Sequence, residues 1–280
     1  MIKYIKSILF LAIIPFASHA QDSLVTEEVN NIKTLIHYKN GQKYLLQSFD
    51  ESGNKWQEIN YYQDGRGKLT LFSNDGDSLL SCDLAPNGLE EGLCIRWHSN
   101  GAKAEESNYR NGLKNGITRQ YYENGQLEEE IELVNNEICD TCKWTRWYPN
   151  GQISLLIQKS KNQYELFYEN GNKKYEITEP GNSIEYYSSG SIFEIKKWAN
   201  DSSGSYKRYY ENGQNLEEGD FNDHNKVTVK NAWNEKGERV IRKGKGKREE
   251  VMMTESGPVR MLSYYKKGKI VKMKEIEKIL

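Results

Sequence analysis

The sequence predicts an all-β protein, an elongated array of antiparallel β-hairpins that forms a single twisted sheet or an open solenoid. Two observations favour this fold class. The motif "YYENGQ" at Tyr121–Gln126 recurs unchanged at Tyr209–Gln214. Turn signals rich in Asn, Asp and Gly also follow one another about every 11 or 12 residues, a spacing typical of short strands joined by tight hairpins. Helix signals are nearly absent, apart from a possible short helical segment in "VKMKEIEKIL" at the C-terminus.

The first twenty residues are predicted to be a cleavable signal peptide. Lys3 and Lys6 form a basic start, Ile8 to Phe16 is an apolar run too short to span a bilayer comfortably, and Ser18 and Ala20 give the small-residue pattern of a cleavage site. An uncleaved membrane anchor is the alternative. We therefore expect an exported protein that is periplasmic, outer-membrane-associated or extracellular.

The remaining chain is predicted to have three parts: a lead-in over residues 21–36, a repeat array over 37–238 and degenerate basic repeats over 239–280. The last part holds 13 Lys/Arg and 5 Asp/Glu, although the whole chain has a net charge of −1. This basic end is either a solvated face or a patch for an anionic surface. The overall charge shows no excess that would indicate nucleic-acid binding.

Ten glycines recur with an aromatic or similar pair three and four residues before them, several at a spacing of 24 residues. They are Gly41, Gly65, Gly101, Gly125, Gly151, Gly171, Gly190, Gly213, Gly237 and Gly268. Weaker turn signals lie between them at Gly53, Gly88 and Gly112. Asn-Gly and Asp-Gly supply the positive φ angles that tight hairpin turns need, so these glycines are predicted to be turn residues.

The aromatic pairs predict a ladder that holds successive hairpins together. Adjacent strand residues point to opposite faces, so each pair would place one ring on each face, against the equivalent ring of the next hairpin. Charged strand residues such as Glu128–Glu130 and Glu217–Glu218 would then flank the ladder in solvent. The predicted ladder consists of Tyr61, Tyr62, Trp97, Tyr121, Tyr122, Trp147, Tyr148, Phe167, Tyr168, Tyr186, Tyr187, Tyr209, Tyr210, Tyr264 and Tyr265.

The segment "GITRQYYENGQL" (Gly116–Leu127) resembles the MORN repeat in its bacterial variant form, as found in YwqK-type antitoxin-like proteins. The resemblance extends over about His37 to Lys269, is strong from Gly92 to Gly213, and departs at Asn234, which replaces the second aromatic residue. It implies an elongated, twisted array of antiparallel hairpins, linked in this family to protein scaffolding and, less securely, to membrane lipids. The antitoxin label implies a cytoplasmic partner, which does not agree with an export signal.

Export makes the four cysteines candidates for disulfides, with three possible connectivities. Cys82 and Cys94 lie six residues on either side of Gly88, so a hairpin turn there would place them opposite each other, unless the strands pair in another register. Cys139 and Cys142 form a CxxC motif that interrupts the repeat spacing and is predicted to replace a hairpin turn. We favour a structural disulfide there, with a redox site and a free or metal-linked pair as alternatives.

No hydrolase motif, phosphate-binding loop or metal-ligand pattern is evident in the sequence. We therefore expect no catalytic residues, cofactor or metal, and predict a non-enzymatic repeat protein that offers a protein-binding or scaffolding surface in the cell envelope. One alternative is an antitoxin-like protein that neutralises a toxin. Another, from a different class, is an envelope thiol–disulfide enzyme that uses Cys139 and Cys142. A specific site is expected where the repeat is broken: at Cys139–Cys142, at Asn200–Ser205 or in the basic end.

Overall fold

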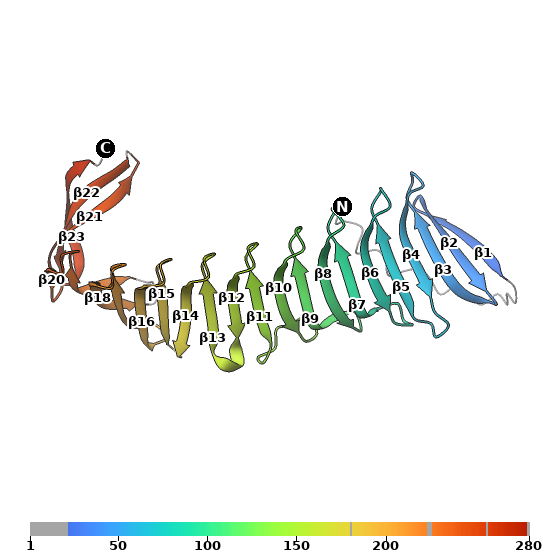
Figure 1. The fold of residues 1–280 in the computed structure, drawn as a ribbon, viewed down its shortest axis with the longest axis horizontal. Coiled ribbons are helices and arrows are strands. Elements are labelled where there is room, and N and C mark those ends of the chain that lie inside the picture. The colour runs from blue at the N-terminus through green and yellow to red at the C-terminus, as the bar shows by residue number, and fades with distance from the viewer. Residues whose placement is uncertain (1–21, 180, 223–225, 256, 279–280) are drawn as a thin grey trace. The chain divides into compact units, whose positions relative to one another are not determined.

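The computed structural model describes residues 22–179, 181–222, 226–255 and 257–278 (Figure 1). These residues form 23 β-strands and one 3₁₀ turn, which confirms the predicted all-β class of antiparallel hairpins. The predicted signal peptide, residues 1–20, lies outside the described residues. No helix in the described part of the chain is long and apolar enough to cross a membrane.

Contacts divide the chain into two compact units, residues 1–115 and 116–280. In the first unit each strand pairs antiparallel with the next one along the chain. Its strands are β1 (Ser23–Val29), β2 (Ile32–Lys39), β3 (Gln42–Phe49), β4 (Lys55–Tyr61), β5 (Gly67–Phe72), β6 (Ser78–Leu84), β7 (Glu90–Trp97) and β8 (Lys103–Arg110).

The second unit follows the same antiparallel rule. Its first strand begins just before the unit boundary. Its elements are β9 (Leu113–Tyr121), β10 (Leu127–Leu133), β11 (Lys143–Trp147), β12 (Ile153–Gln158), the 3₁₀ turn η2 (Lys159–Lys161), β13 (Gln163–Phe167), β14 (Lys173–Glu179), β15 (Asn182–Tyr186), β16 (Ile192–Asn200), β17 (Ser203–Tyr209), β18 (Asn215–Asn222), β19 (Val227–Trp233), β20 (Arg239–Arg242), β21 (Lys245–Thr254), β22 (Gly257–Lys266) and β23 (Lys269–Lys278).

Two kinds of tight turn connect most of the described strands. Three-residue loops close on a glycine, as at Gly125, whose φ is 82°. Two-residue turns have positive φ at both central residues, as at Asn111 (51°) and Gly112 (75°), which is the type I′ geometry that matches the twist of hairpins. All ten predicted turn glycines have φ between 77° and 92°, although Gly41 and Gly268 belong to two-residue turns.

Each unit has its own small apolar core. In the first unit Leu69 and Leu84 pack with Cys82 and Cys94. In the second, Val229, Ala232, Ile241 and Tyr265 form a cluster near the C-terminal end. The turn before β23 closes onto this region, because Gly268 N donates to Gly244 O at 2.9 Å and Val229 N donates to Gly268 O at 3.0 Å. A Cβ at residue 268 would lie 2.5 Å from Thr228 Cγ2, so only glycine fits there without a shift.

The predicted C-terminal helix is wrong. Residues Lys269–Lys278 form strand β23, which pairs with β22 from Lys266↔Lys269 to Val259↔Lys278. The local pattern "KMKEIEK" has helix-forming residues, but the preceding Lys267-Gly268 turn returns the chain along β22. Strand pairing therefore overrides a weak local propensity.

Candidate functional site

The recurring motif "YYENGQ" is a complete hairpin loop. At its first copy Gly125 N donates to Tyr122 O at 2.8 Å, and Tyr122 N donates to Gln126 O at 2.9 Å. Asn124 Oδ1 accepts a further hydrogen bond from Gln126 N at 3.0 Å. The second copy repeats all three bonds, with Asn212 Oδ1 accepting from Gln214 N at 3.0 Å. The letters recur because each loop uses the same main-chain and side-chain bonds.

The aromatic pair has two separate roles in the structure. Only its first member lies in the strand, as the last residue of β9 at Tyr121, whereas Tyr122 already belongs to the loop. The hydroxyl of the second member donates to the main-chain carbonyl of the first aromatic residue in the next repeat. Five such bonds follow one another at 2.7–3.0 Å: Tyr122 to Trp147, Tyr148 to Phe167, Tyr168 to Tyr186, Tyr187 to Tyr209 and Tyr210 to Trp233.

This hydroxyl ladder differs from the ring-on-ring ladder that the sequence suggested. The strand ends one residue earlier than assumed, so the two rings of a pair are not alternating strand residues. The ladder reaches the carbonyl of Trp233, where Asn234 takes the place of a second tyrosine. Tyr264 and Tyr265 lie within β22 and belong to another part of the structure.

A glutamate four residues after the turn glycine is buried in four repeats. For Glu129 and Glu217 this contradicts the prediction that they flank the ladder in solvent. The four are Glu105, Glu129, Glu194 and Glu217, with exposed fractions of 3–9%. Other repeats place Leu69, Leu155 or Ile241 at the same position. The position is therefore a core position of the repeat, and a charged side chain there needs a partner.

Each of these glutamates lies opposite an arginine on a neighbouring strand. The registers pair Arg96 with Glu105, Arg146 with Glu129, and Arg208 with both Glu194 and Glu217. Ion pairs form in every case. The signal was present in the sequence, because an apolar residue alternates with glutamate at one fixed distance from the turn glycine.

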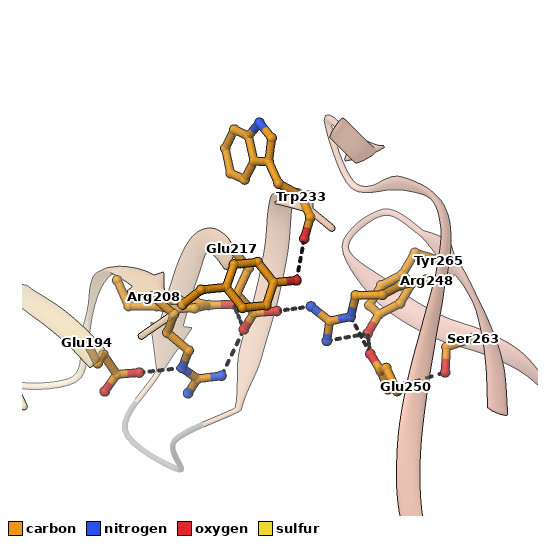
Figure 2. Close-up of polar contacts among 10 residues, drawn as sticks. Glu194, Arg208, Glu217, Trp233, Arg248, Glu250, Ser263 and Tyr265 are labelled. Carbon is orange, nitrogen blue, oxygen red and sulfur yellow. Dashed lines mark hydrogen bonds and ion pairs between the residues drawn. The ribbon is translucent and has the colours of Figure 1, made fainter. Parts of the chain in front are cut away.

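The largest of these clusters is an ionic network in the second unit, which we define by Glu194, Arg208, Glu217, Arg248 and Glu250. Arg208 Nε lies 2.7 Å from Glu194 Oε2, and its Nη1 lies 2.8 Å from Glu217 Oε1. Figure 2 shows Arg208 and Arg248 on opposite sides of Glu217, whose second oxygen contacts Arg248 Nη1. Arg248 also contacts Glu250, which accepts from Tyr265 Oη at 3.1 Å.

The network connects β16, β17 and β18 to the C-terminal strands β21 and β22. Burial alone would lower the pKa of the Arg248 guanidinium, but the charge and hydrogen bond of Glu217 raise the pKa above its usual value. Burial, together with Glu250, raises the pKa of the Tyr265 hydroxyl to about 12. Arg248 and Tyr265 therefore both keep their protons near neutral pH, and their contacts join the C-terminal strands to the repeat strands.

The predicted disulfides are both present. Cys82 and Cys94 lie directly opposite each other on β6 and β7, as the symmetric spacing about Gly88 indicated, and they are bonded. Cys139 and Cys142 are bonded to each other. The two bonds are compatible with an exported protein.

The CxxC loop does not replace a hairpin turn. The turn after β10 is made by Asn135 and Asn136, both at positive φ, and the loop containing the disulfide follows as an extra segment before β11. Cys142 is buried and Cys139 is half-buried. Ser160 N, in η2, donates to Asp140 O at 2.9 Å, so this turn packs against the loop. A strand follows Cys142, not the helix that lowers thiol pKa in redox enzymes.

The other two predicted places for a site differ in character. Asn200 Oδ1 accepts hydrogen bonds from Ser202 N, Ser202 Oγ and Ser203 Oγ, so residues 200–203 form a polar turn. In the basic end, Lys247 Nζ and Lys272 Nζ lie 5.0 and 5.7 Å from the centre of the Tyr264 ring. Within the described ranges, no group of three or more His, Cys, Asp or Glu is placed to hold a metal ion.

Fold and site together define an all-β repeat protein whose recurring residues serve turns, hydroxyl bonds and buried ion pairs. Two segments, residues 114–135 and 203–223, match the family described as MORN repeat variant. Each segment contains one copy of the loop motif and one buried glutamate, Glu129 or Glu217. MORN repeats are consistent with a protein-binding role. A search of curated proteins finds no match to the chain.

Proposed function

We propose that this chain is a non-enzymatic, exported repeat protein that offers a protein-binding or scaffolding surface in the cell envelope. The observation that carries the proposal is that the recurring residues are used for structure. The loop motif closes hairpins, the tyrosine hydroxyls join successive repeats, and the buried carboxylates are paired with arginines. A repeat array that is stabilised in this way leaves its exposed side chains available for a partner.

Exposed apolar side chains on successive hairpins of the second unit support a protein partner. Ile153 and Ile192 each lie two residues after a turn glycine and are 36% exposed, and Ile177 is 38% exposed. Interfaces between proteins combine such apolar contacts with a polar surround. We expect these three isoleucines to lie within the binding surface.

Cross-linking and affinity capture from envelope fractions test the proposal. The intact chain should capture a defined partner, and the variant Ile153→Glu/Ile192→Glu should lose it while keeping its β-sheet circular dichroism. A matched variant, Glu123→Gln/Glu211→Gln, changes exposed loop residues and should bind normally. Failure to capture any partner, together with measurable turnover of a substrate, would contradict the proposal.

The basic end supports a second candidate, association with an anionic surface. Lys247 and Lys272 approach one ring, Tyr264, from β21 and β23, which gathers positive charge on one face of the C-terminal strands. Binding to anionic vesicles should be salt-sensitive and should be lost in Lys247→Glu/Lys272→Glu. The same number of reversals at Lys161 and Lys197 should leave it intact. Equal binding by all three proteins would exclude this surface.

Two further candidates stay open to direct tests. An antitoxin-like role requires a tight one-to-one complex with a toxin, which native mass spectrometry of the captured partner would identify. A thiol–disulfide enzyme would reduce insulin and lose this activity in Cys139→Ser. We expect no such activity, because Cys142 is buried and the loop lacks a helix N-terminus.

A further inference from the structure

Within the part of the chain that the structure describes, the first and last strands each have one open edge. β1 pairs with β2 over Ser23–Val29, and β23 pairs with β22 over Lys269–Lys278. Among the described residues, no other strand pairs with the outer edge of either one. An open edge presents a row of main-chain donors and acceptors that can accept another strand.

The apolar side chains of both edge strands are also unusually exposed. Leu24 and Val29 of β1 are 56% and 57% exposed. In β23 every residue is exposed, with Val271 at 61% and Ile276 at 47%. Apolar side chains that are this exposed on an edge strand favour cover by another chain.

The charges of the two edges are complementary. β1 carries Glu27 and Glu28 and no basic residue. β23 carries four lysines against two glutamates, and one of these, Glu277, already pairs with Arg260 at 3.2 Å. Two β23 strands side by side would bring lysines together, and two β1 strands would bring glutamates together, so each edge disfavours a copy of itself.

We propose that the basic edge of β23 in one copy pairs with the acidic edge of β1 in a second copy. The pairing would continue the antiparallel hydrogen bonding used throughout both units and would cover Leu24, Val29, Val271 and Ile276. Because the two surfaces differ, every copy keeps one free acidic edge and one free basic edge. Such a heterologous interface adds copies head to tail instead of stopping at a dimer. This inference is independent of the proposed partner.

Sedimentation velocity of the purified chain over a range of concentrations tests the proposal, with charge-reversal variants on each edge. Wild type should form oligomers larger than dimers, and added salt should weaken them. The basic-edge variant Lys269→Glu/Lys272→Glu/Lys274→Glu and the acidic-edge variant Glu27→Lys/Glu28→Lys should each lower the association constant by about tenfold or more. A control with the same number of reversals, Lys161→Glu/Lys197→Glu/Lys226→Glu, should assemble like wild type.

Restored assembly is the decisive result, because misfolded variants could not produce it. Mixing the two edge variants brings each reversed edge opposite a complementary one, as does combining both sets of substitutions in one chain. Either should recover assembly. A wild-type chain that is monomeric at every concentration would overturn the proposal. So would a closed dimer that is unaffected by Glu27→Lys/Glu28→Lys, or a mixture that remains monomeric.

Discussion

Arg208 donates from Nη1 to Glu217 Oε1 at 2.8 Å, across the paired strands β17 and β18, and Glu217 is only 3% exposed. Because the other oxygen of Glu217 contacts Arg248, one carboxylate joins the repeat strands to the C-terminal strand β21. Buried charges of this kind contribute little when complete, but a missing member leaves an unpaired charge in a poorly solvated place. Glu217 is therefore the residue on which the C-terminal strands should depend most.

Glu217→Ala is expected to lower the free energy of unfolding by about 3 kcal/mol or more, because two arginines lose their shared partner. Chemical denaturation followed by circular dichroism measures this change. The neighbouring Glu218 offers a matched control: it contacts only Lys207, at 3.9 Å, and Asn231 among the described contacts. Glu218→Ala should cost less than about 1 kcal/mol. Equal losses in the two variants would show that the network does not anchor the C-terminal strands.

Tyr148→Phe removes one hydroxyl of the ladder while retaining the ring. The hydroxyl donates to Phe167 O at 2.8 Å, so its loss should lower the free energy of unfolding by about 1 kcal/mol. Tyr122→Phe and Tyr210→Phe should have similar effects, and the effect of Tyr210→Phe should add to that of Tyr148→Phe, because these two tyrosines are several repeats apart. Tyr62→Phe, at a ring that is 50% exposed, is the control and should be nearly neutral. Thermal unfolding of the four variants would decide the point.

The sequence predicted the fold class and the turns well, since these depend on local residue types. Asn and Gly at fixed positions specify a turn without reference to any distant residue, and all ten glycines have the positive φ that was expected. The Cys82–Cys94 bond followed from the same argument, because a turn at Gly88 fixes which residues face each other.

The buried glutamates could not be predicted in this way. Glutamate in a strand is usually solvated, so its place four residues after the turn glycine, where Leu155 and Ile241 stand in other repeats, does not by itself show that Glu129 or Glu217 is buried. The partner Arg248 is 31 residues away from Glu217 in sequence, in a region where the repeat is too irregular to align. Residues that depend on long-range pairing therefore need the structure.

The two disulfides should differ in susceptibility to reduction. Cys82 and Cys94 are both buried in the core of the first unit, whereas Cys139 is half-buried on a loop. Mild reductant should open the Cys139–Cys142 bond first, as followed by alkylation and mass spectrometry.

Cys82→Ser/Cys94→Ser should lower the free energy of unfolding by about 2–4 kcal/mol, because that bond closes a 12-residue separation. The loss in Cys139→Ser/Cys142→Ser should be smaller, since the separation is 3 residues. A larger loss of stability in Cys139→Ser/Cys142→Ser than in Cys82→Ser/Cys94→Ser would contradict this prediction.

Glu58 should contribute an acid-sensitive part of the stability of the first unit. Hydrogen bonds from Lys55 Nζ at 2.7 Å and Gln47 Nε2 at 3.0 Å lower the pKa of its carboxyl from the usual 4.5 to about 2. A carboxyl whose pKa is lower in the folded state stabilises the fold fully above the unfolded value, and this contribution is lost as the pH falls from about 4.5 to about 2. Glu58→Gln should therefore reduce the difference in melting temperature between pH 5 and pH 2 (about the two limits of this window). Lys55→Met should act in the same direction, because it removes the main cause of the pKa shift. If neither substitution changes the difference in melting temperature between the two pH values, this carboxyl is not linked to folding.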